Sequence, residues 1–381
     1  MDPTVDMHPR TCARIHLDRL RCNYHQIRKA IAPAALIPVV KADAYGHGAV
    51  SVSRCLVNEG AGLLAVAQFQ EAMELRESGI DIPVLIFGRL FPDELPHAIR
   101  AGFRVTLFGV DDIRWIERAA SHQPAYVHVK VDTGMGRVGV LPGHAGRLVD
   151  DLMRSRCCVW EGLYSHFATA DESDKTYAHQ QLAAFQTLTQ HLQAKFPLPP
   201  LVHMANSGAV LDLPESRLDA CRSGILLYGH YPSRQTSRSI PLEQVMTLAS
   251  VVAHVRRLPA GHYVSYGRRW QTDRETTVAV LPIGYADGLR RHLTGRLQVV
   301  IGGRCYPVVG TITMDQMMVD VGDDAVAVGD AVLIWGDAEG GSIQVLDVAD
   351  AMGTIPYEMT CGISRRVARV IVDPDRPPSI A

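Results

Sequence analysis

Short apolar runs recur at a regular interval through the first half of the chain. Within each run, apolar and β-branched residues follow one another with little polar alternation, which is typical of a parallel strand covered on both faces. Four of them begin at Gly62, Pro83, Arg104 and Ala125, each 21 positions after the one before. Four more runs of the same kind lie at 36–41, 159–168, 201–206 and 221–229.

The segments between these runs carry apolar residues at helical spacing, as at 69–75 and 182–196. Asp111 and Asp112 precede the apolar side chains of another such segment and predict a helix N-terminus there. Eight alternating strands and helices predict an α/β fold, a (β/α)8 TIM-type barrel, with an open doubly wound sheet as the alternative. We favour the barrel because no G-x-G-x-x-G motif follows the first strand.

The pattern changes after a polar stretch at 232–241 that contains proline and serine. Beyond it, short strand-like runs separated by glycine-rich turns begin at Thr277, Leu297, Gln316 and Val328, and a helix is predicted over 345–352. The sequence therefore predicts two domains. The barrel would occupy residues 11–235, and a mainly β domain would occupy residues 236–381.

Composition excludes several classes of protein. The formal net charge of −2 provides no cationic field for nucleic acid, and no apolar run reaches the ~20 residues that span a bilayer. Residues 1–11 lack the apolar core of a signal peptide, and the eight cysteines include no C-x-x-C pair. We therefore expect a cytoplasmic protein with reduced cysteines, no metal site, and no nucleic-acid or membrane partner.

Polar residues gather where the predicted barrel strands end. In a (β/α)8 barrel the catalytic groups lie at the C-terminal ends of the strands, so these residues are the candidate site. One such residue ending an apolar run is unremarkable, but a set from five strands indicates a function. The set consists of Lys41, Lys130, Asp132, Arg137, Ser165, His166, Asn206, Ser207 and Arg222.

Two features of this set indicate the chemistry. Lys41 ends the first strand just before a glycine-rich turn, and a lysine in an apolar site can lose its proton and then form a Schiff base or act as a base. Ser207-Gly208 and Gly224-Ile225 follow the last two strands, where barrels commonly bind phosphate. A lysine with a phosphate site indicates pyridoxal phosphate, or else a Schiff-base aldolase acting on a sugar phosphate.

The same segments resemble the motifs of the alanine racemase family. In the barrel these are KADAYGHG at 41–48, KVDTGMGRVG at 130–139, YSHFATAD at 164–171, HMANSGA at 203–209 and CRSGILLYG at 221–229. In the second domain they are SYG at 265–267, PIGYADG at 282–288, MDQ at 314–316 and PYE at 356–358. The resemblance runs in family order from about Thr11 to Arg369. It implies a pyridoxal 5'-phosphate enzyme that interconverts L-alanine and D-alanine, working as a homodimer with its active site at the subunit interface.

The resemblance assigns the two catalytic bases. Lys41 would hold the cofactor as an aldimine and serve the D-face of the substrate, whereas Tyr266 of the partner subunit would serve the L-face. Two bases on opposite faces are what a racemase requires. His166 and Arg222 match a relay to that tyrosine, and Arg222 also matches the residue that faces the pyridine nitrogen. The implied cofactor-binding residues are Lys41, Tyr45, His166, Asn206, Ser207, Arg222, Gly224, Ile225 and Tyr357.

The resemblance also assigns substrate contacts. Arg137 and the backbone amide of Met314, the latter from the partner subunit, would bind the substrate carboxylate. Lys130 matches a lysine that is carbamylated in some family members, where it steadies this arginine. Tyr285 matches a residue that narrows the substrate entrance. Whether such an enzyme supplies D-alanine for the cell wall or degrades L-alanine is left open.

Two other classes share part of the pattern. Single-barrel pyridoxal phosphate carrier proteins resemble the first half alone, and they lack a second domain. Barrel-type amino acid decarboxylases share the two-domain architecture and the lysine. The segment Thr313-Met314-Asp315 and Tyr266 fit the racemases instead. A purely structural role would leave the polar strand ends unexplained.

Overall fold

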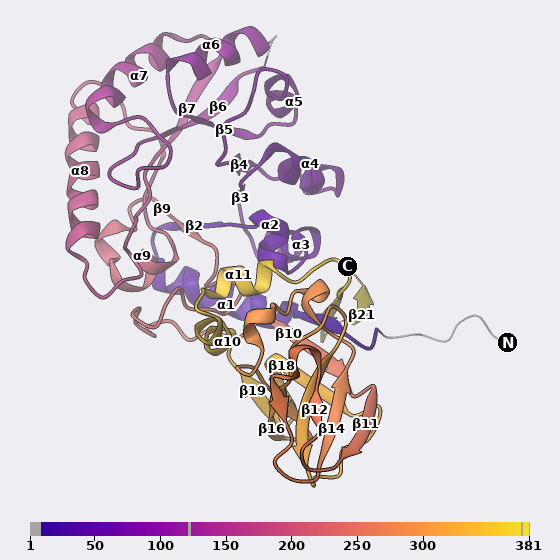
Figure 1. The fold of residues 1–381 in the computed structure, drawn as a ribbon. Coiled ribbons are helices and arrows are strands. Elements are labelled where there is room, and N and C mark those ends of the chain that lie inside the picture. The colour runs from indigo at the N-terminus through magenta and orange to yellow at the C-terminus, as the bar shows by residue number, and fades with distance from the viewer. Residues whose placement is uncertain (1–8, 121–122, 375, 381) are drawn as a thin grey trace, which may run out of the picture.

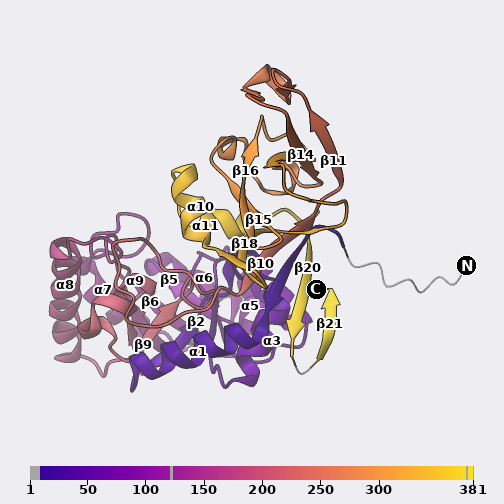
Figure 2. The same cartoon turned by 90° about the horizontal axis from the view of Figure 1, so that it is seen from below.

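The computed structural model describes residues 9–120, 123–374 and 376–380. Residues 1–8, on which most of the prediction about a signal peptide rests, lie outside these ranges. Figure 1 shows a ring of strands and helices, coloured indigo to magenta, beside a second body built mainly of orange and yellow strands. Figure 2 shows that the second body lies against one end of the ring.

The ring is a parallel barrel of eight strands in the order β2-β9-β8-β7-β6-β5-β4-β3. A parallel bridge between Val39 and Ala65 joins the two ends of this order, so the barrel is nearly closed. The predicted barrel is confirmed and the open sheet is excluded. Its strands are β2 (Ala35–Pro38), β3 (Leu64–Val66), β4 (Val84–Ile86), β5 (Arg104–Leu107), β6 (Ala125–Lys130), β7 (Cys158–Tyr164), β8 (Leu201–His203) and β9 (Ala220–Ser223).

Helices cover the outside of the barrel because each presents one apolar face to the strands. The acidic pair at 111–112 begins a helix as predicted: the Asp112 carboxylate accepts hydrogen bonds from the N–H groups of Phe108 and Gly109. The helices of this half are α1 (Leu17–Ile31), α2 (Lys41–Gly46), α3 (Ala49–Asn58), α4 (Phe69–Glu77), α5 (Leu95–Arg100), α6 (Val110–Ala119), α7 (Pro142–Arg154), α8 (Thr176–Gln193) and α9 (Ser207–Asp212).

The second body is built on a largely antiparallel sheet in the order β11-β14-β17-β16-β15-β18-β10-β1-β20-β21, with β19 paired to β18 and with β12 and β13 as a separate two-stranded sheet. The predicted helix over 345–352 is α10 (Val345–Met352), and α11 (Pro356–Cys361) follows it. The strands are β10 (Met246–Val251), β11 (His254–Leu258), β12 (Tyr263–Val264), β13 (Trp270–Gln271), β14 (Thr276–Leu281), β15 (Gln298–Ile301), β16 (Arg304–Val309), β17 (Met317–Gly322), β18 (Ala331–Ala338), β19 (Gly341–Ile343), β20 (Ala368–Asp373) and β21 (Arg376–Ile380).

One strand, predicted to belong to the barrel domain, belongs to the second body instead. The predicted barrel starts at residue 11, but β1 (Cys12–His16) belongs to the second sheet. It pairs with β20 in parallel, placing Cys12 opposite Ala368, and with β10 in antiparallel register. Alternating burial in the segment is compatible with either sheet, and only pairing with the distant β20 decides between them. The two bodies therefore share one continuous buried core.

Two side-chain and backbone contacts fix the second body against the mouth of the barrel. A Cβ on Gly46, at the end of α2, would lie 2.3 Å from the carbonyl oxygen of Thr360 in α11, so only glycine fits there. Arg369 in β20 donates its Nε–H to the carbonyl of Gly46 and its other N–H groups to carbonyls at 363–367. Among the described helices, none is both long and apolar enough to cross a membrane.

Candidate active site

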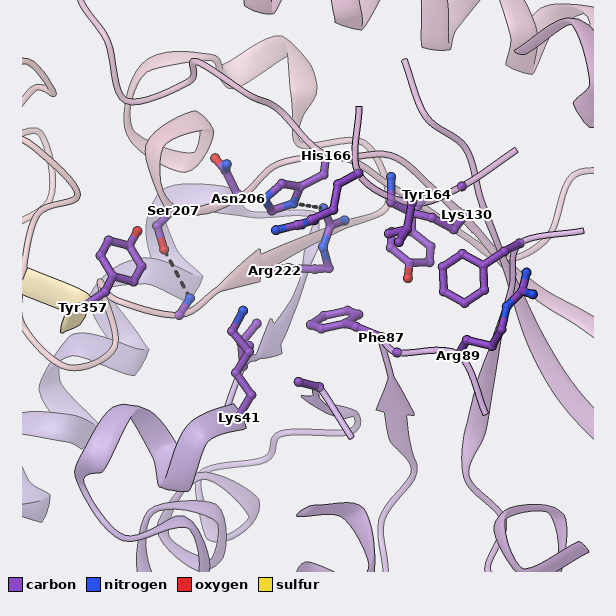
Figure 3. Close-up of a pocket in the computed structure, with 18 of the residues that line it drawn as sticks. Lys41, Phe87, Arg89, Lys130, Tyr164, His166, Asn206, Ser207, Arg222 and Tyr357 are labelled. Carbon is purple, nitrogen blue, oxygen red and sulfur yellow. Dashed lines mark hydrogen bonds between the residues drawn. The ribbon is translucent and has the colours of Figure 1, made fainter. Parts of the chain in front are cut away.

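A cavity of about 620 Å³ opens at the C-terminal ends of the barrel strands. Figure 3 shows side chains from the strand ends and from α11 turned into it. Most of the predicted site residues meet here, which is the arrangement expected of a barrel enzyme. The predicted residues that line it are Lys41, Tyr45, Lys130, Arg137, His166, Asn206, Ser207, Arg222, Gly224 and Tyr357.

Lys41 begins α2, at the point where the chain leaves β2. Burial lowers the pKa of its amine, and the charge of Arg137 lowers it further. The four residues that follow, 42–45, all adopt left-handed helical backbone angles, with φ between 51° and 56°. Residues with a side chain rarely take this conformation, and each one costs about 1–2 kcal/mol. Such strain is retained where the surrounding structure fixes it, commonly at functional sites.

Glu71 is the main support of this left-handed turn. One carboxylate oxygen accepts a hydrogen bond from the N–H of Ala42, at 2.6 Å, directly after Lys41. The other accepts the N–H groups of Ala67 and Gln68, at 2.7 and 3.0 Å, and so caps α4. One side chain thus links the first residue of the left-handed turn to the start of α4.

The opposite end of the cavity is a cradle of hydroxyl groups. The hydroxyl of Ser207 accepts the N–H of Gly224 at 3.2 Å, and the Tyr45 and Tyr357 rings lie 5.9 Å apart, centroid to centroid. A Cβ on Gly224 would lie 2.2 Å from the Tyr45 hydroxyl, so any larger residue there would displace the Tyr45 ring. Ser207 also begins α9, whose first N–H groups add donors. This donor set suits a phosphate group, as expected from the sequence.

Arg222 forms the third wall, and its hydrogen-bond partners among the described residues are all uncharged groups. It donates to the carbonyl of Ser165 at 2.7 Å, to Nδ1 of His166 at 3.3 Å and to Nδ1 of His203 at 2.7 Å. Burial lowers its pKa to about 10, so it remains a cation at neutral pH. Burial and the charge of Arg222 lower the pKa of both histidines well below the usual value. Both rings are therefore neutral acceptors toward the guanidinium.

Lys130 and Arg137 lie on the remaining side of the cavity. Burial, and then the charge of Arg222, lower the pKa of Lys130 to about 7, and its Nζ donates to the carbonyl of Val131 at 2.7 Å. The Asp132 carboxylate accepts the N–H groups of 134, 135 and 136, which shapes the loop that carries Arg137. Two basic side chains thus face one side of the cavity, where a substrate carboxylate would be attracted.

Six predicted site residues do not line this cavity, and two of them, Asp132 and Ser165, act through the loop contacts and the Arg222 hydrogen bond described above. Ile225 is buried beside Gly224, whereas Tyr266, Tyr285 and Met314 lie on the second body with 70, 40 and 51% of their surface exposed. Ser265 adopts a left-handed φ of 66° just before Tyr266, and its hydroxyl donates to the carbonyl of Thr311. The backbone N–H of Tyr285 donates to Thr313, so the Tyr285 and Met314 loops are tied together.

Some residues of the site were missed by the sequence analysis. Tyr164 lies within the YSHFATAD motif, yet its stacking on His203, with ring centroids 4.9 Å apart and an interplanar angle of 3°, depends on two strands meeting. Phe87 and Arg89 line the cavity after β4. A polar residue following that apolar run was a visible signal for Arg89. Glu71 gave none, because a glutamate in the first turn of a helix is ordinary capping.

The cavity fits a cofactor with a phosphate at one end, a carbonyl near its centre and a ring nitrogen at the other end. Ser207 and Tyr357 supply hydroxyl groups at the first point, the Lys41 amine lies between, and Arg222 supplies a donor at the third (Figure 3). Tyr45, which lines the same cavity, adds a third hydroxyl group at the first point. A (β/α)8 barrel with this arrangement and a β domain against its mouth defines the class of barrel-type pyridoxal 5'-phosphate enzymes.

Comparison with known proteins identifies the family within that class. Residues 15–232 match the family model "Alanine racemase, N-terminal domain", and residues 245–371 match "Alanine racemase, C-terminal domain". The chain belongs to the alanine racemase family, whose members depend on pyridoxal 5'-phosphate. The carrier, decarboxylase and aldolase alternatives are thereby excluded as its family.

Curated relatives and solved structures agree. An alanine racemase of Clostridium novyi is 40% identical over 366 residues, covering 94% of this chain and 95% of that protein. The structure of an alanine racemase of Clostridium difficile 630 superposes with a TM-score of 0.93 at 36% identity, covering 99% of each chain. An alanine racemase structure from the D-cycloserine-producing Streptomyces lavendulae gives 0.91 at 36% identity, covering 97% of this chain and 98% of that one.

Proposed function

We propose that this protein interconverts L-alanine and D-alanine, using Lys41 and the partner subunit's Tyr266 as its two acid–base groups. The observation that carries the proposal is the placement of the Lys41 amine, with its lowered pKa, between a hydroxyl cradle and a buried arginine. Family membership supports the substrate, since the matched relatives are alanine racemases.

Bound pyridoxal phosphate would supply an electron sink that eases removal of the α-proton of the substrate. Lys41 Nζ, as a neutral amine, would take that proton from one face or return it there. The hydroxyl oxygen of the partner's Tyr266 would do the same on the opposite face. Inversion of the carbon needs a proton to leave one face and another to arrive on the other, so neither residue suffices alone.

The remaining site residues would bind and orient. Ser207, Tyr45, Tyr357 and the backbone amides of Gly224 and Ile225 would hold the phosphate, with Asn206 fixing the start of α9 through its hydrogen bond to the Ala209 N–H. Arg222 would face the ring nitrogen, and His166 would join it to the partner's tyrosine. Arg137 and the Met314 amide would bind the substrate carboxylate, and Tyr285 would narrow the entrance.

We infer a homodimer because the chain does not complete this site by itself. Tyr266 and Met314 are exposed on the second body and do not line the cavity of their own chain. Large apolar side chains exposed together are typical of an interaction surface. A second copy placing this surface over the barrel mouth would complete two equivalent sites. A reducing, cytoplasmic location is supported by all eight cysteines being free thiols.

A proton NMR time course in deuterated water tests the proposal. The holoenzyme should remove the α-proton signal of L-alanine and form D-alanine, with the same exchange when D-alanine is supplied. Exchange without D-alanine would mean that only one face is served, which contradicts the two-base proposal. No exchange with alanine, but exchange with another amino acid, would contradict the substrate.

Lys130 is proposed to carry a carbamate. With a pKa of about 7 the amine is mostly neutral at pH 8, where it can attack carbon dioxide: an N–C bond forms, the nitrogen loses one proton and a carbamate anion results. That anion beside Arg137 would hold the guanidinium in position. Lys130→Met should then lower kcat/KM for alanine about tenfold, chiefly by raising KM, as losses in a supporting shell do.

Carbon dioxide-free buffer gives the direct measurement. Wild-type activity should fall in such buffer and recover when bicarbonate is added, whereas Lys130→Met should respond to neither. Lys195→Met, on the surface beyond α8, serves as the control and should behave as wild type. Wild-type activity independent of bicarbonate would mean that Lys130 acts as a plain amine.

A further inference from the structure

A series of buried and partly buried hydrogen bonds runs from Arg222 down through the barrel interior, away from the cavity. His203 Nδ1 accepts from Arg222 Nη1 at 2.7 Å, and His203 Nε2 lies 3.1 Å from Nδ1 of His128. Nε2 of His128 lies 3.1 Å from an oxygen of Glu161. Arg104, the first residue of β5, holds that carboxylate through Nε and Nη2 at 2.8–3.1 Å. Both histidines are fully buried.

Each imidazole proton in this series of hydrogen bonds has only one consistent position. An arginine can only donate, so His203 must accept on Nδ1 and carry its proton on Nε2. That proton is donated to Nδ1 of His128, which must therefore carry its own proton on Nε2 and donate it to Glu161. The donors of Arg104 face the same carboxylate from the other side. The direction of donation is thus set at one end by Arg222, which can only donate, and at the other end by the Glu161 carboxylate, which can only accept.

The charges and the packing agree with this assignment. Burial lowers the pKa of His128 and of His203, so both rings are neutral. Burial alone would raise the pKa of Glu161, but His128 and Arg104 outweigh it and lower the pKa to about 2. Gly162 leaves room for the imidazole ring of His128, since a Cβ at position 162 would lie 2.1 Å from Nδ1 of His128. Among the described residues, Arg222 forms no ion pair with a carboxylate. The two histidines connect it to the carboxylate of Glu161 instead.

We propose that Glu161 is a positioning residue that acts through His128 and His203 to hold Arg222 as a fixed donor at the wall of the active-site cavity. The inference rests on the proposed role of Arg222 toward the cofactor ring. If the direction of donation were reversed in any one of these hydrogen bonds, both rings would have to adopt the opposite tautomer. His203 would then present an N–H to the guanidinium. The Glu161 carboxylate on β7 therefore selects the arrangement of Arg222 on β9, through His128 on β6 and His203 on β8.

The test is proton NMR of the holoenzyme labelled with [15N]histidine. Two imidazole N–H protons, both on Nε2, should resonate downfield in slow exchange with water, one from His128 and one from His203. Glu161→Gln should shift or remove both, because the amide can donate where the carboxylate only accepts. It should also lower kcat about tenfold with little change in KM, in the range found when supporting partners of site residues are removed. His203 does not touch Glu161, so loosened packing at residue 161 alone would leave its signal in place.

Two further variants make the outcome decisive. Gly162→Ala displaces the His128 ring without altering a titratable group and should reproduce the loss of both signals, which also covers failure of Glu161→Gln to fold. Asp219→Asn, an exposed carboxylate that accepts the Val202 N–H at the start of β8, should change neither signal nor kcat. Protonation of either ring on Nδ1 in the wild type, or an unchanged His203 signal in both variants, would overturn the inference. A wild-type holoenzyme that gives both signals but does not racemise alanine would instead contradict the proposed function.

Discussion

Replacing Lys41 with alanine is expected to reduce the rate of alanine racemisation by about 10²–10⁴-fold, the range for loss of a general base. The amine lies between the hydroxyl cradle and Arg222, and its pKa is lowered by burial, so it is set up both to hold a carbonyl compound and to move a proton. The measurement is the α-proton exchange rate in deuterated water, started from each enantiomer. Added methylamine should restore part of the rate, because the missing group is an amine.

The control for this variant is Lys29→Ala, which removes an exposed lysine from α1 and should leave the rate unchanged. Denaturant unfolding of both proteins separates loss of chemistry from loss of fold. Exchange within a few-fold of wild type in folded Lys41→Ala would contradict the assignment of the base. Loss of exchange from D-alanine alone would agree with Lys41 as the base of the D-face, but would mean that another group holds the cofactor.

Mixing two inactive variants is expected to restore activity if the site is shared between subunits. Lys41→Ala removes a group that lines the cavity of its own chain, whereas Tyr266→Ala removes an exposed group proposed to act in the partner. In a mixed dimer, one site carries both substitutions and the other carries neither. Random exchange of equal amounts makes half of the dimers mixed, so about a quarter of wild-type activity should return.

The mixing experiment needs proof that subunits exchange. Affinity tags of two kinds, one on each variant, allow mixed dimers to be isolated and counted. Differently tagged copies of Lys41→Ala mixed with each other form the control and should stay inactive. Isolated mixed dimers without activity would show that Lys41 and Tyr266 do not belong to the same intersubunit site.

The barrel was predictable because its signals are local. Each strand is a short apolar run, and the interval of 21 positions between four of them exposes the repeat before any contact is known. The helix at 345–352 was predicted with its exact bounds for the same reason, since Gly353 ends its apolar periodicity in a left-handed conformation. In contrast, β1 belongs to a sheet whose neighbouring strand lies at the other end of the chain. No pattern within five residues encodes such a pairing.

The candidate site likewise contains residues that the local sequence indicates and residues that it does not. Lys41, Arg222 and Ser207 stand at strand ends and could be proposed from position alone. Tyr266 and Met314 lie in loops of the second body with no local sign of chemistry, and only the resemblance to a family named them. The left-handed turn at 42–45 gave no signal, because Ala42 and Ala44 are good helix formers and their backbone angles are imposed by Glu71 and the packed α11.

The pairing of β1 with both β10 and β20 has a consequence for synthesis of the chain on the ribosome. The barrel strands emerge first and can pair among themselves as they appear. Residues 12–16, although made at the start, have no parallel partner until Ala368 and its neighbours have left the exit tunnel. β10 can pair with one edge of β1 once residues 246–251 have emerged, but the opposite edge waits unpaired until β20 has been made. A nascent chain released before β20 would carry a formed barrel with an open sheet edge, which is the kind of surface that quality-control chaperones and proteases recognise.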